Sequence, residues 1–276
     1  MFLIARKNLF NDKTKFAISV GGVAFSVLLI LMLNGVYQGW NQALGSYAES
    51  IPADLWVEQD GVGDMFHTLS FLPDNLAQEL ESIEGVALAQ KYLGRQMVFK
   101  QNGQDASLFV VGFNTETGLG RPNAMKEGDW KELKMGEIIA DSAFLQKYDL
   151  KVGDKITISD TPLTIAAVSD KGNLMMAQYA FITFEQAEQL FKIGDKVNFY
   201  IVNVKEGANL AAVKEQIKEK IPGTKTLTKE EYVDASRQTI VDGFLPIVYV
   251  LVFISVLVGI AVIGLTIYSS TVEKSR

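Results

Sequence analysis

Two long stretches without a charged residue limit what this 276-residue chain can fold into. The first runs from Phe16 to Val36 and the second from Phe244 to Tyr268. At about 1.5 Å of helix per residue, each can cross the roughly 30 Å hydrocarbon core of a bilayer. The alternatives are a cleavable signal peptide for the first stretch, which lacks an A-x-A-like cleavage site after it, and a buried core helix for the second. The sequence therefore predicts two transmembrane helices.

Basic residues at both ends of the chain predict its orientation. Residues 1–15 carry four Lys or Arg against one Asp, and the far end carries Lys274 and Arg276 against Glu273. Because positively charged flanks stay in the cytoplasm, both termini are expected there. The predicted division is a cytoplasmic segment, a first transmembrane helix, an extracytoplasmic domain, a second transmembrane helix and a cytoplasmic tail, at 1–15, 16–36, 37–243, 244–268 and 269–276.

The external segment is acidic and predicts an α+β domain. Residues 37–242 hold 20 Lys and Arg against 30 Asp and Glu, so the net charge is 20 − 30 = −10. Alternating apolar residues indicate strands at 54–59, 180–184 and 197–204 and hairpins at 96–113 and 155–168, which turn at Asn102-Gly103 and at residues 160–162. Helical spacing indicates helices over Leu76–Ile83 and Leu210–Ile221. The chain has no cysteine, so this domain must be stabilised by its own core.

The junctions between this domain and the apolar stretches favour continuous helices. Residues 38–50 contain no proline, and residues 229–242 have a helical composition. Each transmembrane helix is therefore expected to continue outward as a stalk, or else to pack on the domain there. Small residues four apart, which allow close helix packing in lipid, form three candidate packing pairs: Ala17 with Gly21, Gly22 with Ser26, and Ser255 with Gly259.

Several kinds of catalytic site are missing from the sequence. His67 is the one histidine and there is no cysteine, so a Cys-His dyad or a cluster of several histidines cannot form. No G-x-x-x-x-G-K-[ST] phosphate loop occurs, so any ATP must be bound by another subunit. A pair of carboxylates of the glycosidase type remains open. We expect no enzyme activity, no metal, no bound cofactor and no nucleic acid partner.

Four segments, taken in order, resemble one family of membrane proteins. They are ARKNLFNDKTKFAISVGGVAFSVLLILML at the start, ADLWVEQDG, EIIADSAFLQKYDLKVGDKITI with the following PLTIAAV, and IGLTIYSSTVEKSR at the end. This series is similar to the MacB-type permeases of ABC transporters. That family includes lipoprotein-release permeases, macrolide and peptide exporters and a relative used in cell division.

The resemblance implies a function and a set of partners. It implies a permease subunit of an ABC-type exporter in the bacterial plasma membrane, with a MacB periplasmic-core-like domain outside. Such a subunit relays ATP-driven movement from a separate ATPase to the external domain, to export or extract a peptide, drug, lipid or lipoprotein. A second permease subunit, identical or different, would pair with it in the lipid bilayer, and a periplasmic adaptor protein is a further partner left open.

The number of membrane spans and the charged residues at both ends bear on the resemblance to this family. Family members have four membrane spans, whereas this sequence stops after its second, so it is either a fragment or a shortened relative. The charged residues nearest the ATPase or the lipid headgroups would be Arg6, Lys7, Glu273, Lys274 and Arg276. These residues would otherwise serve only to fix the topology.

Two other functions remain open at this point. The first is a signal relay without transport, of the cell-division permease type, which controls an extracytoplasmic partner. The second is a membrane-anchored binding domain or enzyme that is not coupled to an ATPase.

Overall fold

The computed structural model describes residues 13–62, 69–170 and 178–274. The chain divides into two compact units, which are described separately. The helical unit extends up to Asn41 and resumes at Ile240, and the sheet unit comprises Gln42–Thr239.

The helical unit is built from two long helices, α2 (Lys13–Ser50) and α7 (Lys229–Lys274). Within the described residues, Val20–Gly39 of α2 is the one helix long and apolar enough to cross a membrane, and Leu245–Ala261 of α7 is a shorter apolar stretch. Both predicted segments are thus helical. Both helices also continue beyond the apolar segments into the sheet unit, as the sequence predicted.

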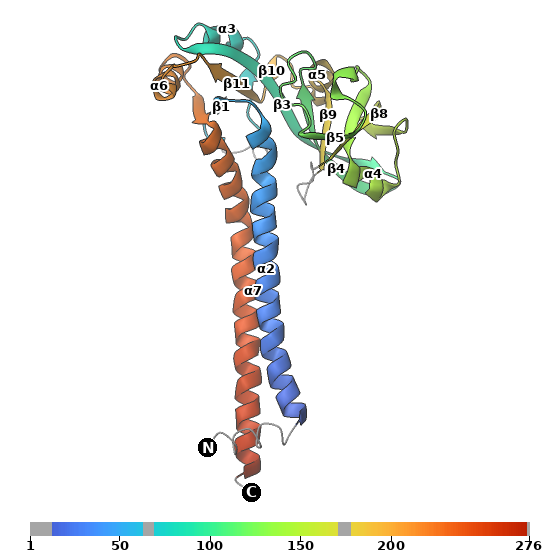
Figure 1. Ribbon diagram of the computed structural model, residues 1–276, viewed down its shortest axis with the longest axis vertical. Coiled ribbons are helices and arrows are strands. Elements are labelled where there is room, and N and C mark those ends of the chain that lie inside the picture. The colour runs from blue at the N-terminus through green and yellow to red at the C-terminus, as the bar shows by residue number, and fades with distance from the viewer. Residues whose placement is uncertain (1–12, 63–68, 171–177, 275–276) are drawn as a thin grey trace. The chain divides into compact units, whose positions relative to one another are not determined.

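The sheet unit contains one large mixed sheet of ten strands in the order β12-β1-β11-β3-β4-β9-β6-β8-β5, with β7 paired to β8 (Figure 1). A separate pair joins β2 (Leu72–Pro73) to β10 (Lys196–Val197). The strands of the large sheet are β1 (Leu55–Gln59), β3 (Val86–Gln101), β4 (Gln104–Phe113), β5 (Ala124–Glu127), β6 (Glu137–Asp141), β7 (Lys155–Ile158), β8 (Thr161–Asp170), β9 (Gln178–Thr183), β11 (Phe199–Val204) and β12 (Thr224–Thr228).

The long strand β3 joins two parts of this sheet. Residues Val86–Tyr92 of β3 pair with β11, whereas Leu93–Gln101 pair with β4. We call β12, β1, β11 and the start of β3 the first part, and the end of β3 with β4 to β9 the second part. The first part is antiparallel throughout, and the second includes the parallel pairs β4–β9 and β6–β8.

Short helices belong to each part (Figure 1). In the first part, α3 (Leu76–Glu81) contacts β3 and α6 (Leu210–Lys220) contacts β12. In the second part, α4 (Ser142–Tyr148) contacts β6 and β8, and α5 (Phe184–Phe191) contacts β4. A short 3-10 helix, η1, covers Trp130–Glu132. Side chains of Asp141, Thr183 and Asn209 cap the starts of α4, α5 and α6 by accepting backbone N–H groups.

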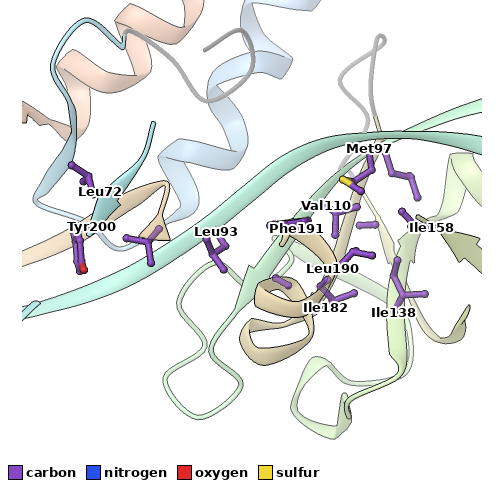
Figure 2. Close-up of a cluster of buried hydrophobic side chains, with 14 of the residues drawn as sticks. Leu72, Leu93, Met97, Val110, Ile138, Ile158, Ile182, Leu190, Phe191 and Tyr200 are labelled. Carbon is purple, nitrogen blue, oxygen red and sulfur yellow. The ribbon is translucent and has the colours of Figure 1, made fainter. Parts of the chain in front are cut away.

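A single hydrophobic core runs under both parts of the sheet. Figure 2 shows Leu72 and Tyr200 near the first part, and Leu93, Ile138 and Ile182 in the second. The core also includes Leu80 and Ile83, as the apolar stripe of the predicted helix required, together with Val213 and Ile217 of α6. Removing these side chains from water provides the main stabilisation of the fold.

Most predicted elements are present, with four corrections. The strand predicted at 197–204 begins at Phe199, because Val197 pairs with Leu72 in the separate pair of β2 and β10. The strand predicted at 180–184 ends at Thr183, because the Thr183 hydroxyl caps α5 and Phe184 already belongs to that helix. The second hairpin turns at Ser159-Asp160, both with positive φ of 47° and 67°, and Pro162 lies inside β8 opposite Thr157. Strand β3 begins at Val86, ten residues before the predicted hairpin.

Candidate functional site

The face of the sheet opposite the core is lined with buried aromatic rings. Successive side chains of a strand point to opposite faces, so Leu55 and Val57 enter the core while Trp56 points away from it. The same alternation places seven buried aromatic side chains from five strands on this face, which we call the aromatic face: Trp56, Tyr92, Phe109, Phe113, Tyr179, Phe181 and Phe199.

Helix α7 attaches to the aromatic face in the first part of the sheet. The Tyr232 ring, which is fully buried, stacks on Trp56 with ring centroids 4.1 Å apart and planes 5° from parallel. The rings of Phe199 and Tyr232 make a T-shaped contact with centroids 5.8 Å apart. Val233 and Ser236 on the same side of the helix are also buried. The first turns of α7 are therefore packed on β1 and β11.

The start of α7 is fixed by a capping box. The Thr228 hydroxyl accepts the Glu231 backbone N–H at 3.2 Å, and the Glu231 carboxylate accepts the Thr228 N–H at 2.8 Å. Lys214 of α6 forms an ion pair with the same carboxylate. The hydrogen bond from Lys214, followed by that from the Thr228 backbone, lowers the pKa of Glu231 below its usual value.

Helix α2 attaches to the second part of the sheet through Tyr47. The Tyr47 hydroxyl donates to the backbone oxygen of Gly120 at 2.7 Å, in the connection that follows β4. The centroid of its ring lies 4.5 Å from that of Tyr179 and 5.8 Å from that of Phe181, both in β9. Burial raises the pKa of the Tyr47 phenol, so this hydroxyl remains a hydrogen-bond donor at physiological pH.

Polar contacts link the two attachments. The Arg237 guanidinium of α7 pairs with Glu49 of α2 and also, at 3.5 Å, with Asp234 one turn earlier. Lys229 N–H donates to Asp54 O at 3.3 Å, which connects the start of α7 to the start of β1. The helix ends are thus tied to each other, and their tyrosines contact mainly different parts of one sheet, with Tyr47 also interacting with Tyr92 of β3.

The junction between the two parts lies at Gly94 in β3. A Cβ added at Gly94 would approach the Phe109 ring to 2.9 Å, so the ring occupies the space of a side chain. Gly94 N–H donates to Asn198 Oδ1, and Asn198 Nδ2 donates to Ser70 O, each at 3.0 Å. Asn198 is buried and belongs to the chain leading into β11, so this network joins the parts at a defined point.

Some of the predicted packing residues contact the other helix in the helical unit, and others do not. Ser26 Oγ donates to Gly22 O at 3.1 Å and lies 3.5 Å from Ser255 O of α7, and a Cβ on Gly259 would stand 3.9 Å from Ser26 Oγ. Ser26 thus contacts Ser255 and Gly259 of α7, while its bond to Gly22 lies within α2. Ala17 is exposed, and no atom lies within 4 Å of a Cβ added at Gly21, so that pair makes no such contact among the described residues.

The predicted charged end residues lie mostly outside the part of the chain that the structure describes. Arg6, Lys7 and Arg276 lie outside the described residues, as does His67, while Glu273 and Lys274 belong to the last turn of α7. Within 13–62, 69–170 and 178–274, no three His, Cys, Asp or Glu residues are grouped so as to hold a metal ion.

Sequence reasoning missed both tyrosine attachments. The pattern T-K-E-E at 228–231 is a capping-box signature that marks the start of α7. Nothing local marks Tyr47, because Gly120 is 73 residues away in the sequence.

Comparison with known proteins decides the family. The sequence pattern of the MacB-like periplasmic core domain matches residues 16–220, more than half of the chain. The chain belongs to this MacB-type permease family. The core-domain match begins within α2 and ends at the last residue of α6, so it includes the whole large sheet except β12.

Two solved structures are similar to this MacB-like chain. The periplasmic region of MacB from Actinobacillus actinomycetemcomitans is 10% identical, with a TM-score of 0.48 over 70% of this chain and 94% of that one. The extracellular domain of the ABC-type transporter YknZ from Gram-positive bacteria is 9% identical, with a TM-score of 0.47 over 64% and 100%. No curated protein sequence matches the chain. With an apolar N-terminal helix before a periplasmic-type domain, the chain has the features of a membrane-anchored protein with an extracytoplasmic domain.

Proposed function

We propose that this chain is a permease subunit of an ABC-type exporter that relays ATP-driven movement to its external domain. The ATP would be bound and hydrolysed by a separate ATPase subunit, and the chain itself would have no catalytic residue or cofactor. The transported substrate would be a peptide, drug, lipid or lipoprotein. The observation that carries this proposal is the attachment of α2 and α7 to different parts of one sheet.

The proposed mechanism follows from these two attachments. A shift of α7 relative to α2 acts on the first part of the sheet through Tyr232 and Trp56. The second part is held by Tyr47 through Gly120 and Tyr179. Because β3 is shared by both parts, a relative displacement of the helices changes the angle between the parts near Gly94. The Arg237–Glu49 ion pair limits that displacement.

The proposed topology places both apolar segments in the bacterial plasma membrane. Phe25 of α2 and Phe253 of α7 are 61% and 63% exposed within the helical unit, as side chains that face lipid would be. Both termini would be cytoplasmic, with Arg6, Lys7, Glu273, Lys274 and Arg276 at the ATPase or the lipid headgroups. A second permease subunit would pair with this one.

Affinity purification from native membranes tests this proposal. The tag replaces part of the exposed turn at Asn102-Gly103, and the co-purified proteins are identified and assayed for vanadate-sensitive ATP hydrolysis. Recovery of a phosphate-loop ATPase together with vanadate-sensitive activity is the expected result. Recovery of the intact chain without any ATPase would overturn the proposal.

The identity of the co-purified proteins distinguishes the proposed exporter from the two alternative functions. An adaptor protein in the same sample indicates export. A cell-wall hydrolase that co-purifies with the ATPase, with no exported cargo, indicates the signal relay of the cell-division type. A chain that binds a ligand but no ATPase is an anchored binding domain.

A further inference from the structure

The end of α2 borders a pocket of about 300 Å³ in the sheet unit. One wall is formed by Ser50 and the following Ile51 and Pro52, at the end of the helix. The other wall is the connection between β4 and β5, which contributes Thr117, Gly118, Gly120, Arg121, Pro122 and Asn123. This volume is at the lower end of the range for small-molecule sites, enough for one or two residues of a peptide.

Arg121 is the one charged residue among those that line the pocket. Its guanidinium carbon lies 5.1 Å from the centre of the Trp130 ring, a cation–π arrangement that fixes the side chain without using its N–H groups. A Cβ added at Gly118 would approach the same ring to 2.8 Å, so the absence of a side chain there lets Trp130 reach this position. Within the described part of the chain, Arg121 has no carboxylate partner.

Hydrogen bonds hold the wall that carries Arg121 in a defined shape. Asn114 accepts the Glu116 and Thr117 N–H groups on its side chain and the Gly118 N–H on its backbone oxygen, at 2.8 to 3.1 Å. The Thr117 hydroxyl donates to Gln90 at 2.8 Å, and Arg121 N–H donates to Gly118 O at 3.2 Å. The guanidinium is therefore presented by an ordered loop, and binding a ligand there would order few additional groups.

The single positive charge and the proline residues of the pocket favour a ligand that combines a carboxylate with a small aliphatic group. One arginine balances one negative charge, and its planar pair of N–H donors matches the two oxygens of a carboxylate. A phosphate dianion would need more positive charge than one guanidinium in a domain whose net charge is 20 − 30 = −10. Pro52 and Pro122 supply apolar surface beside Arg121 for a small aliphatic side chain.

We propose that this pocket binds the C-terminal carboxylate of a peptide segment, with Arg121 as the paired cation. This mode of recognition is known for chain termini in general, and it does not require ATP-driven movement. The site joins the end of α2 to the loop that carries Gly120, the acceptor of the Tyr47 hydroxyl. A bound peptide would contact both sides of that attachment.

Fluorine NMR of the full chain labelled with 5-fluorotryptophan tests this site directly. The chain has three tryptophans, so the Trp130 resonance is assigned from a Trp130→Phe variant. The probes are N-acetyl-Ala-Ala-Ala with a free carboxylate and the same peptide with a C-terminal amide, each titrated to about 10 mM. We expect a saturable shift of the Trp130 resonance with the acid, and binding of the amide weaker by about tenfold or more.

Two variants separate the pocket from general charge effects. Arg121→Gln is expected to remove the preference for the acid, while its Trp56 resonance stays in place as a check of folding. Lys126→Gln removes an exposed cation of β5 that does not line the pocket, and it should keep the preference. The proposal would be overturned if the unmodified chain bound acid and amide equally, or if neither peptide shifted the resonance. It would also be overturned if folded Arg121→Gln kept the preference for the acid.

Discussion

The ring of Tyr232 in α7 stacks on Trp56 in β1 with centroids 4.1 Å apart, at planes only 5° from parallel. The other long helix, α2, makes its corresponding contact through Tyr47, with Gly120 in the connection after β4 and with Tyr179 in β9. Two helices that continue from apolar segments thus hold two separate parts of one sheet. In the proposed function, movement of one helix relative to the other would act on the sheet through these two contacts.

Replacing Tyr232 with Ala tests the attachment of α7. The variant loses a fully buried ring and leaves a cavity against Trp56, so we expect the free energy of unfolding to fall by about 3 to 5 kcal/mol. The measurement is chemical unfolding of the full chain in detergent, followed by tryptophan fluorescence. Tyr232→Phe keeps the stacked ring and is the matched control. A loss for Tyr232→Ala no larger than that for Tyr232→Phe would show that the stack does not stabilise the domain.

The capping box gives a second, smaller effect. Thr228→Ala removes the hydroxyl that accepts the Glu231 N–H, so we expect a loss of about 1 kcal/mol, whereas Thr228→Ser should retain nearly full stability. The pKa of Glu231 is lowered in the folded protein, so its contribution is present above the unfolded-state pKa of about 4.3 and is lost as the pH falls through the folded-state value. Equal stabilities of the Ala and Ser variants at neutral pH would contradict the assignment of the cap.

Much of the fold follows from local sequence patterns. The alternation in residues 54–59 predicts β1, and Asn102-Gly103 predicts the turn between β3 and β4, where both residues have positive φ of 51° and 77°. The apolar stripes predict α3 and α6. These elements are predictable because each pattern reflects one neighbouring turn or one buried face.

The remainder depends on contacts between distant segments. Strand β9 pairs in parallel with β4, from Leu108 with Gln178 to Phe113 with Thr183, and no local pattern specifies that partner. Helix α5 has only eight residues, too few for a clear helical period. Of the predicted packing residues, Ser26 lies against Ser255 and Gly259 of α7. The sequence could not choose between them and Ala17 with Gly21, because spacing alone does not identify the partner helix.

High pH should weaken the attachment of α2. Burial raises the pKa of Tyr47 in the folded protein, so its stabilising effect is complete below the unfolded-state pKa of about 10 and is lost as the pH rises toward the folded-state value. At pH of about 8, Tyr47→Phe should be less stable than the unmodified chain by about 1 kcal/mol, because the bond to Gly120 is lost.

The pH dependence of this difference is the diagnostic result. Unfolding is measured for both proteins at several values above pH of about 10, where lysines titrate equally in each. The difference in stability between them should shrink or reverse there. A difference that stays constant or grows with pH would mean that the Tyr47 phenol is not held neutral by burial.

The contact between Gly259 of α7 and Ser26 of α2 can be tested with two matched substitutions. A Cβ at Gly259 would already stand in van der Waals contact with Ser26 Oγ, at 3.9 Å, so the longer side chain of leucine is expected to press on α2, whereas Gly21 has open space around it. The cysteine-free chain allows spin labels at Val20→Cys and Ile263→Cys, both exposed positions. Gly259→Leu should change the distance between the labels by about 2 Å, within the range over which side-chain size sets helix separation. Gly21→Leu should leave it unchanged, and equal effects of both substitutions would argue against this contact.

The most direct test of coupling places one spin label on each part of the sheet. Exposed Glu219 in α6 and Gln104 at the start of β4 are replaced with Cys, and the distance between the labels is measured in the complex with the proposed ATPase subunit. We predict that the distance distribution differs between the nucleotide-free and the ADP–vanadate-trapped complex, and that Tyr47→Ala abolishes the difference. Identical distributions in both states of a complex that hydrolyses ATP would contradict the account.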